Sequence, residues 1–121
     1  MSKVHRSILK ASQEPEQATY LILNLLRQKT LPEAITALPH LSTLELTVGP
    51  LFDLAQALVL LKKCGKLREL RFNNGEVRRL PKELGGLTQL RRLDLWCCAF
   101  EEIPAALFSL TSLEVLAFCR A

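Results

Sequence analysis

The sequence predicts an α/β solenoid, in which each short unit adds one strand to a concave parallel sheet and one helical turn to the convex side. Two observations lead to this fold class. A strand-like phrase recurs at a regular step, and a phrase that begins with Leu-Pro or Ile-Pro recurs between the strands. One such unit buries only one face, so its stability must come from stacking on its neighbours.

The strand phrase has the apolar spacing L-x-x-L-x-L. It begins at Leu67, Leu90 and Leu113, in steps of 23 residues, and at Leu41, one step of 26 residues earlier. A related phrase begins at Ala18, another 23 residues back. Residues two apart point to one face of an extended strand, so the spacing predicts five short strands whose leucines face inward.

The second phrase lies between the strands and reads LPEAITAL at 31–38, LPKELGGL at 80–87 and IPAALFSL at 103–110. Its apolar period of three to four predicts a short helix or 3₁₀ turn, and proline suits the first turn because it needs no N–H partner there. The second unit carries the apolar run 51–63 instead, which predicts a longer helix. A doubly wound sheet is the alternative fold, but its βαβ step needs about 30 or more residues.

This pattern resembles the leucine-rich repeat family over about residues 18–121. The step of 23 residues with LP-x-x-[IL]-x-x-L is similar to the Ras-suppressor-like intracellular group, and such repeats also occur in bacterial cytoplasmic proteins. The resemblance implies about four and a half repeats, at 18–40, 41–66, 67–89, 90–112 and a partial 113–121. The asparagine that the family usually places at the ninth position is absent, so the turns must satisfy their backbone groups differently. That position holds Leu26, Gly49, Gly75, Cys98 and Ala121.

Residues 1–17 are expected to form an N-terminal capping helix and linker. The helix is predicted over 2–13, with Val4, Ile8 and Leu9 facing inward. One helix over 15–28, with an acidic start and a basic end, is the alternative to the first strand. The repeat register runs through this segment unbroken and favours the strand.

The other end of the chain has no obvious C-terminal cap. Leu113, Leu116 and Phe118 complete a strand phrase, and no descending turn follows before Ala121. An exposed strand edge with apolar flanks invites pairing with another chain. The sequence therefore predicts either self-association through this edge or a fragment of a longer array.

The resemblance implies that the x positions of the strand phrase point to the concave face, where they form four columns across the strands. The third position holds Tyr20, Thr43, Glu69, Arg92 and Val115. The fifth holds Ile22, Glu45, Arg71, Asp94 and Ala117. The seventh holds Asn24, Thr47, Asn73, Trp96 and Cys119. The eighth holds Leu25, Val48, Asn74, Cys97 and Arg120.

We predict a partner-binding site on this face, formed by Trp96, Arg71, Asp94, Glu45, Arg92, Glu69, Asn73, Thr47 and Tyr20. An exposed tryptophan near arginine is typical of binding hot spots, although single exposed aromatics are also common. The charges of the fifth column alternate in sign. They form either an exposed ladder of ion pairs, each worth about 0–1 kcal/mol, or a charged floor that selects a partner.

We predict no catalytic centre, metal site or cofactor. The only histidines, His5 and His40, lie far in sequence from the cysteines, and no phosphate-binding or zinc-binding motif is present. Cys97 and Cys98 are contiguous, unlike the spaced cysteine pairs of zinc sites. The register turns Cys98 inward and Cys97 outward, near enough to Cys119 for oxidation under stress.

Charge is uneven along the chain. Residues 62–92 hold ten lysines and arginines against three glutamates. This block suggests a weak binder of nucleic acid or another polyanion, but its residues fall on different sides of the repeats and lack the aromatics that stack on bases. The sequence therefore does not favour nucleic acid as a partner.

Neither a signal peptide nor a membrane-spanning run is recognisable, and the cysteines lack the spacing of a disulfide framework, which favours the cytoplasm. The sequence predicts a protein–protein interaction module that binds a partner through its concave face. A regulatory or recognition fragment of a larger protein or assembly is the alternative function.

Overall fold

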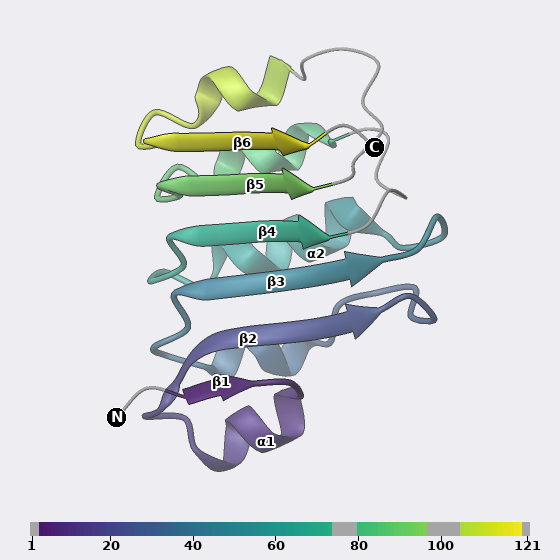
Figure 1. The fold of residues 1–121 in the computed structure, drawn as a ribbon, viewed down its shortest axis with the longest axis vertical. Coiled ribbons are helices and arrows are strands. Elements are labelled where there is room, and N and C mark those ends of the chain that lie inside the picture. The colour runs from purple at the N-terminus through teal and green to yellow at the C-terminus, as the bar shows by residue number, and fades with distance from the viewer. Residues whose placement is uncertain (1–2, 74–79, 97–104, 120–121) are drawn as a thin grey trace.

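The chain forms one six-stranded parallel sheet in which the strands follow one another in sequence order (Figure 1). The computed structural model describes residues 3–73, 80–96 and 105–119. The strands are β1 (Lys3–His5), β2 (Ala18–Leu25), β3 (Thr43–Val48), β4 (Glu69–Asn73), β5 (Arg92–Trp96) and β6 (Val115–Cys119). This order is that of a stack in which each unit contacts its neighbours, as the sequence predicted.

Short helices connect the strands. They are α1 (Ile8–Gln13), the 3₁₀ helix η1 (Glu33–Ala37), α2 (Leu54–Lys62), and the 3₁₀ helices η2 (Lys82–Gly86) and η3 (Ala105–Ser109). α2 lies behind the sheet in Figure 1, so the face toward the viewer is not covered by it. We call that uncovered face of β2–β6 the open face.

The strands are in the register that the repeats predict. Leu44, Leu70 and Leu93 are Cα partners on β3, β4 and β5, and all three are fully buried. The backbone hydrogen bonds between neighbouring strands begin one residue before each strand. The Arg68 amide donates to Ser42 O at 2.9 Å, and the Arg91 amide donates to Arg68 O at 2.8 Å. Side chains alternate along each strand, so the leucines enter one core between the sheet and the helices.

The helical segments η1, η2 and α2 each begin after a residue that favours a helix start. Pro32 and Pro81 precede η1 and η2, whose Ile35 and Leu84 are fully buried. The longer α2 begins after Asp53, whose Oδ1 accepts a hydrogen bond from the Gln56 amide at 3.1 Å. The predictions of helical turns at 31–38, 80–87 and 103–110 and of a longer helix in the second unit are confirmed.

Gln56 also connects α2 to the preceding repeat. Its Nε2 donates to Leu31 O and its Oε1 accepts from the Leu31 amide, each at 3.0 Å. Leu31 is buried, so this side chain satisfies two backbone groups that have little access to water.

The N-terminal segment differs from the prediction of one helix over 2–13. Residues 3–5 form β1, which pairs in parallel with β2, and the helix begins only at Ile8, after the N-cap Ser7. Val4 and Leu9 are exposed, whereas His5 and Ala11 are buried. The prediction failed because a strand that extends the sheet turns alternate residues inward, which a helical period does not describe. The rival helix over 15–28 is excluded by β2.

Candidate functional site

The open face carries three of the predicted columns. The third position aligns Tyr20 with Thr43, Thr43 with Glu69, Glu69 with Arg92 and Arg92 with Val115. The fifth position aligns Ile22 with Glu45, Glu45 with Arg71, Arg71 with Asp94 and Asp94 with Ala117. The seventh aligns Asn24 with Thr47, Thr47 with Asn73, and Trp96 with Cys119. The repeat register thus brings the predicted site residues onto neighbouring strands.

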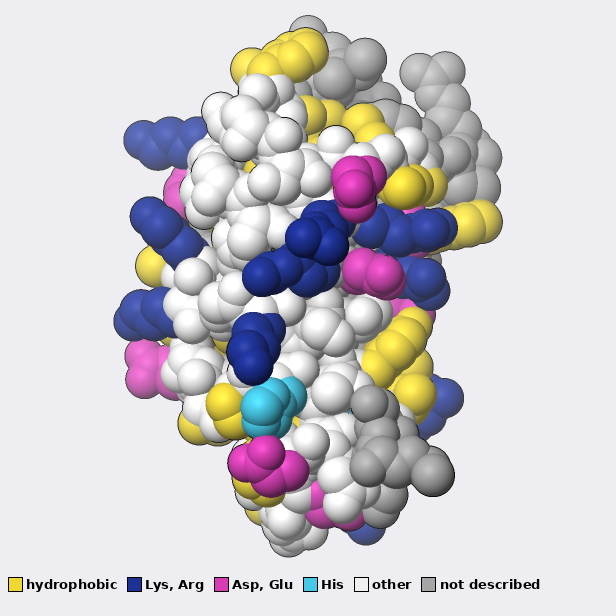
Figure 2. All heavy atoms as spheres, turned by 90° about the vertical axis from the view of Figure 1, so that its left-hand side faces the viewer, with side chains coloured by type: hydrophobic (Ala, Val, Ile, Leu, Met, Phe, Trp, Pro, Cys, Tyr) yellow, Lys and Arg dark blue, Asp and Glu magenta, His cyan; other side chains and the backbone are white. Residues whose placement is uncertain are grey.

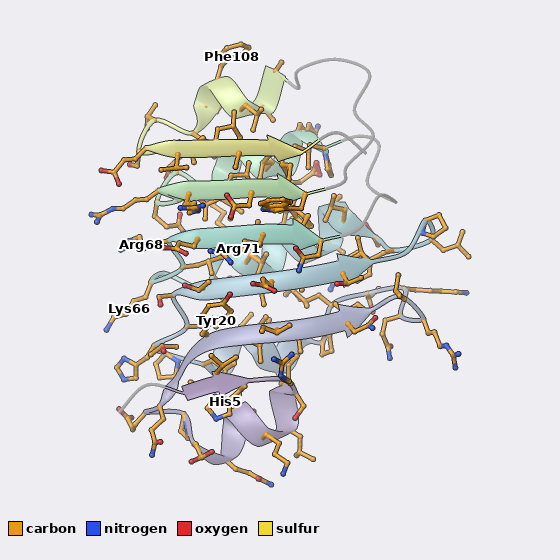
Figure 3. All side chains as sticks on the ribbon, in the orientation of Figure 1. His5, Tyr20, Lys66, Arg68, Arg71 and Phe108 are labelled. Atoms are coloured by element: carbon orange, nitrogen blue, oxygen red, sulfur yellow. The ribbon has the colours of Figure 1, made fainter. Side chains whose placement is uncertain are left out.

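Glu45 is the centre of a hydrogen-bond cluster from three strands. Its Oε1 accepts from Tyr20 Oη at 2.5 Å and from Arg71 Nη1 at 3.2 Å, and its Oε2 accepts from Asn73 Nδ2 at 3.0 Å. Arg71 Nη1 also lies 3.4 Å from Tyr20 Oη, and Figure 3 shows these two labelled side chains on the same face. A carboxylate with three donors is well satisfied, so the cluster holds these side chains in place.

Asp94 connects two arginines. Arg92 Nε donates to both carboxylate oxygens, at 3.1 and 3.2 Å. Arg71 Nε lies 3.0 Å from Asp94 Oδ2, but its N–H makes no hydrogen bond, so this contact is an ion pair with poor alignment. The alternating charges of the fifth column are therefore joined from Glu45 through Arg71 to Asp94.

The pKa values reflect this cluster. Burial by itself raises the pKa of Glu45, but the hydrogen bonds from Tyr20, Asn73 and Arg71 together hold it below its ordinary value. The hydrogen bond to Glu45, followed by burial, raises the pKa of Tyr20. Burial lowers the pKa of Arg71, but Tyr20 in its ionised form, Asp94 and Glu45 outweigh this effect and raise the pKa. Glu45 and Arg71 are therefore ionised and Tyr20 is neutral near neutral pH.

The row of alternating charges in the fifth column is less exposed than expected. Asp94 is buried and Glu45 and Arg71 are partly buried, so the estimate for exposed pairs does not apply to this column. Glu69 and Thr47 lie on the same face but take no part in the cluster described above. Trp96, at the end of β5, is 48% exposed, which leaves much of its ring area for contact with another molecule.

In the first two repeats, the eighth position does not lie on the open face. Leu25 and Val48 are Cα partners and are buried in the core, whereas Leu26, predicted to point inward, is exposed. The prediction was wrong because β2 and β3 keep their alternation through Leu25 and Val48, one residue further than the family pattern assumes. Asn74, Cys97, Cys98, Gly75, Ala121 and Arg120 lie outside the described residues.

The turn after β2 satisfies its backbone without the ladder of ninth-position asparagines. Asn24 Oδ1 accepts a hydrogen bond from the Leu26 amide at 3.2 Å, and the Gln28 amide donates to Leu25 O at 3.1 Å. Asparagine at the seventh position thus forms the local turn contact in this repeat.

The basic block 62–92 is spread over several sides of the molecule. Lys62 and Lys82 lie on helical elements, Lys66 and Arg68 lie where the strands begin, and Arg71 is on the open face (Figure 3). Figure 2 shows the side where the strands begin, with a group of lysine and arginine side chains in its middle and acidic ones next to them. Arg78 and Arg79 lie outside the described residues. Within the described residues the block does not form one continuous surface.

The histidines lie near the N-terminal end of the stack. His5 Nε2 is 3.2 Å from Glu14 Oε1, and His40 Nε2 is 2.9 Å from Glu16 Oε2. Cys64 is buried, which raises the pKa of its thiol, and its Sγ is 3.8 Å from Ile35 O. In the described ranges no group of three or more metal-ligating side chains occurs. Cys119 belongs to β6, but the predicted proximity of Cys97 to it falls outside those ranges.

Phe108 was not among the residues predicted from the sequence. This residue of η3 is exposed, as are Val115 and Leu116 on the adjacent edge strand β6 (Figure 3). A signal existed, because Phe108 occupies the position of Thr36 and Gly85 in the Pro-containing phrase, and a large apolar residue there breaks the pattern. Gly85 packs toward the next unit, since a Cβ on it would lie 3.1 Å from Ser109 Cβ.

No helix in the described part of the chain has the length and hydropathy that a membrane crossing requires. No family model matches the sequence, and no curated protein matches it. The solved structures similar to this one include two bacterial proteins. A leucine-rich repeat protein of Leptospira interrogans shares 28% identity at a TM-score of 0.79, over 98% of this chain and 29% of its own. An internalin of Listeria monocytogenes shares 17% identity at a TM-score of 0.53, over 96% of this chain and 39% of its own.

The second likeness, at low identity, supports the fold alone, and the chain spans less than half the length of either neighbour. Both the architecture and the first neighbour agree with the family resemblance that the repeats indicated. The Ras-suppressor-like subtype stays a prediction. By structural likeness, the chain has the leucine-rich repeat fold, in which parallel strands of one sheet alternate with short helices and 3₁₀ turns.

Proposed function

We propose that this protein is an interaction module that binds a protein partner through the open face of its sheet. Proteins with this fold generally mediate protein binding and typically have no enzymatic activity. The observation that carries the proposal is the arrangement around Trp96, a half-exposed indole on the same strand and face as Arg92 and Asp94. Exposed tryptophan and arginine next to satisfied polar groups are typical of the centres of interfaces.

The network that holds the face rigid supports this proposal. Tyr20, Glu45, Arg71 and Asn73 are connected by hydrogen bonds across β2, β3 and β4. Side chains that are already held lose less conformational entropy when a partner binds. We propose Trp96, Arg71, Asp94, Glu45, Arg92, Glu69, Asn73, Thr47 and Tyr20 as the residues of the binding face. Asp94 and Glu45 act mainly to position the arginines, and Glu69 contributes to selectivity as a carboxylate beside Arg92.

A pull-down with matched baits tests the function. Wild type, Trp96→Ala and Arg71→Glu are compared with Lys66→Gln, a charge change on the strand-start side. We expect a specific partner to be retained by wild type and Lys66→Gln and lost by the other two. Arg71→Glu brings a third carboxylate against Glu45 and Asp94 and should unfold at a lower urea concentration than the other baits, so its loss of binding is read where circular dichroism shows that it is folded. A partner that is retained by Trp96→Ala and Arg71→Glu would place binding elsewhere.

The length of the structural neighbours supports a second candidate function, that of a recognition part within a larger protein or assembly. The chain matches 29% and 39% of those two chains. Genes or domains found next to this sequence would distinguish this role from that of an independent adaptor.

Self-association through β6 is a further proposed contact. Phe108, Val115 and Leu116 are exposed there, and Glu114 is the only charged residue in 105–117. A nearly neutral apolar strand edge fits a second copy of itself without repulsion. Sedimentation of wild type and of the double variant Phe108→Ser with Leu116→Lys tests this contact, since a dimer that the double variant still forms would exclude this edge.

The cytoplasm stays our proposed location, because the cysteines lack the spacing of a disulfide framework.

A further inference from the structure

Four charged groups around Asp94 on the open face are layered by sign. The carboxylate side chains are the more buried, with Asp94 at 1% exposure and Glu45 at 15%, whereas Arg71 is 31% and Arg92 is 40% exposed. The four charges sum to zero, yet a molecule that approaches the sheet meets the guanidinium groups first. Around Asp94, the more accessible charges are therefore those of Arg71 and Arg92, with Glu69 next to Arg92 on β4.

Arg92 has unused hydrogen-bond donors. Its Nε is occupied by Asp94, and within residues 3–73, 80–96 and 105–119 no hydrogen bond or ion pair uses its Nη1 or Nη2. Asp94 holds the inner side of the guanidinium, which fixes its plane. The two terminal nitrogens of an arginine match the two oxygens of a carboxylate, so this group is prepared for a bidentate contact.

Arg92 and Trp96 lie on the same face of β5, four positions apart. At about 3.3 Å per residue, four residues span about 13 Å along a strand. An extended partner peptide has nearly the same rise, so a carboxylate on Arg92 and an apolar side chain on Trp96 would be separated by three to five residues of that peptide.

We propose that the open face recognises an extended acidic peptide whose carboxylate binds Arg92 and whose apolar side chain, three to five residues away, packs on Trp96. This inference rests on the proposed function and names the partner class of the same face. A nucleic acid fits less well, because its charge repeats at each nucleotide. Glu69 is in register with Arg92 on β4, and Glu45 lies below Arg71, so carboxylates flank both cations.

The intrinsic fluorescence of Trp96 gives a direct measurement, since it is the only tryptophan in the chain. The probes are synthetic peptides with one glutamate placed three, four or five residues from one leucine in a Ser/Thr/Ala background. Matched copies have glutamine in place of glutamate. We expect a saturable change in fluorescence for at least one glutamate peptide and binding weaker by about tenfold for its glutamine copy.

Protein variants test the role of each charge. Arg92→Gln should remove the preference for glutamate over glutamine, and Arg92→Lys should keep only part of it, because lysine has the charge without the fork. Glu69→Gln should strengthen binding a few-fold, since it removes a competing carboxylate beside Arg92. Lys66→Gln, with the same change of charge as Arg92→Gln, should leave binding unchanged at moderate salt.

A folding defect in Arg92→Gln is controlled by the double variant Arg92→Gln with Asp94→Asn, which leaves no unpaired carboxylate beneath the site. Both should lose the preference for glutamate while circular dichroism stays native. Equal binding of glutamate and glutamine peptides, an unaltered preference in Arg92→Gln, or no binding of any glutamate peptide would overturn the proposal. Stronger, salt-sensitive binding of a thymidine oligonucleotide would do so as well. If the pull-down partner still depends on Trp96 in these cases, the interaction function stands and only the acidic-peptide assignment fails.

Discussion

Arg92 and Asp94 stand two residues apart on β5, and the Arg92 Nε donates to both oxygens of the buried Asp94 carboxylate, at 3.1 and 3.2 Å. Arg71 from β4 also lies next to this carboxylate, with its Nε 3.0 Å from Asp94 Oδ2. Two cations around one buried anion keep the charge of Asp94 compensated in a place with little water.

Asp94→Ala should destabilise the fold by about 1–3 kcal/mol, because it leaves two partly buried guanidinium groups without their carboxylate. The expected loss is below that of a fully buried pair, since both arginines reach solvent. Urea unfolding measures it, with Thr47→Ala on the same face as the control. A change for Asp94→Ala no larger than for the control would mean that the ion pairs contribute little.

The backbone N–H and C=O groups of Leu31 have the Gln56 side chain as their hydrogen-bond partner. Gln56→Ala should lower the free energy of unfolding by about 1–3 kcal/mol, because a buried N–H and C=O lose their partners. Gln28→Ala, at an exposed position, should change it by less than about 0.5 kcal/mol. Equal effects of the two substitutions would show that water replaces the Gln56 side chain without loss.

Gly49 lies where the turns of the first two repeats meet. A Cβ on this residue would be 2.8 Å from the backbone oxygen of Leu26, a contact that requires the backbone to shift. Gly49→Ala should therefore destabilise the protein by about 1–3 kcal/mol. Gly65→Ala is the matched control, since nothing lies within 4 Å of its Cβ position, and it should be neutral or slightly stabilising. Thermal unfolding measures both variants, and equal Tm values would contradict the close approach of Gly49 to the Leu26 backbone.

Tyr20 should make stability depend on alkaline pH. Its folded pKa is raised above the ordinary 10.0, first by the hydrogen bond to Glu45. The folded state therefore holds the proton more tightly than the unfolded state, so the added stability is fully present below pH 10.0 and is lost as pH rises through the folded pKa. The difference in unfolding free energy between wild type and Tyr20→Phe should shrink above pH 10.0. A constant difference would exclude this linkage.

Glu45 should have the opposite dependence. Its folded pKa is below the ordinary 4.5 after the hydrogen bonds from Tyr20, Asn73 and Arg71 outweigh burial. Its contribution is present above pH 4.5 and is lost as pH falls through the folded pKa. Wild type should exceed Glu45→Gln in stability at neutral pH, and the two should converge under acid conditions in urea unfolding series.

Much of the open face was predictable because the repeat step sets the strand register. Once Leu44, Leu70 and Leu93 are aligned, the residues after them are aligned too, which placed Glu45, Arg71 and Asp94 side by side. The ends of the strands were less predictable. Whether Leu25 or Leu26 points inward depends on where extended backbone stops, and an apolar residue at both positions gives no signal.

The repeat length and leucine spacing by themselves determined the parallel sheet, its strand order and the columns of its open face, because periodic apolar residues can be buried together in only one register. Only the tertiary structure decided which charges of those columns are buried and which reach solvent. That outcome depends on contacts such as the one between Arg71 and Tyr20, which are 51 residues apart in sequence. Burial of Asp94 beneath Arg92 turned an alternating row of charges into a face that presents guanidinium groups beside Trp96.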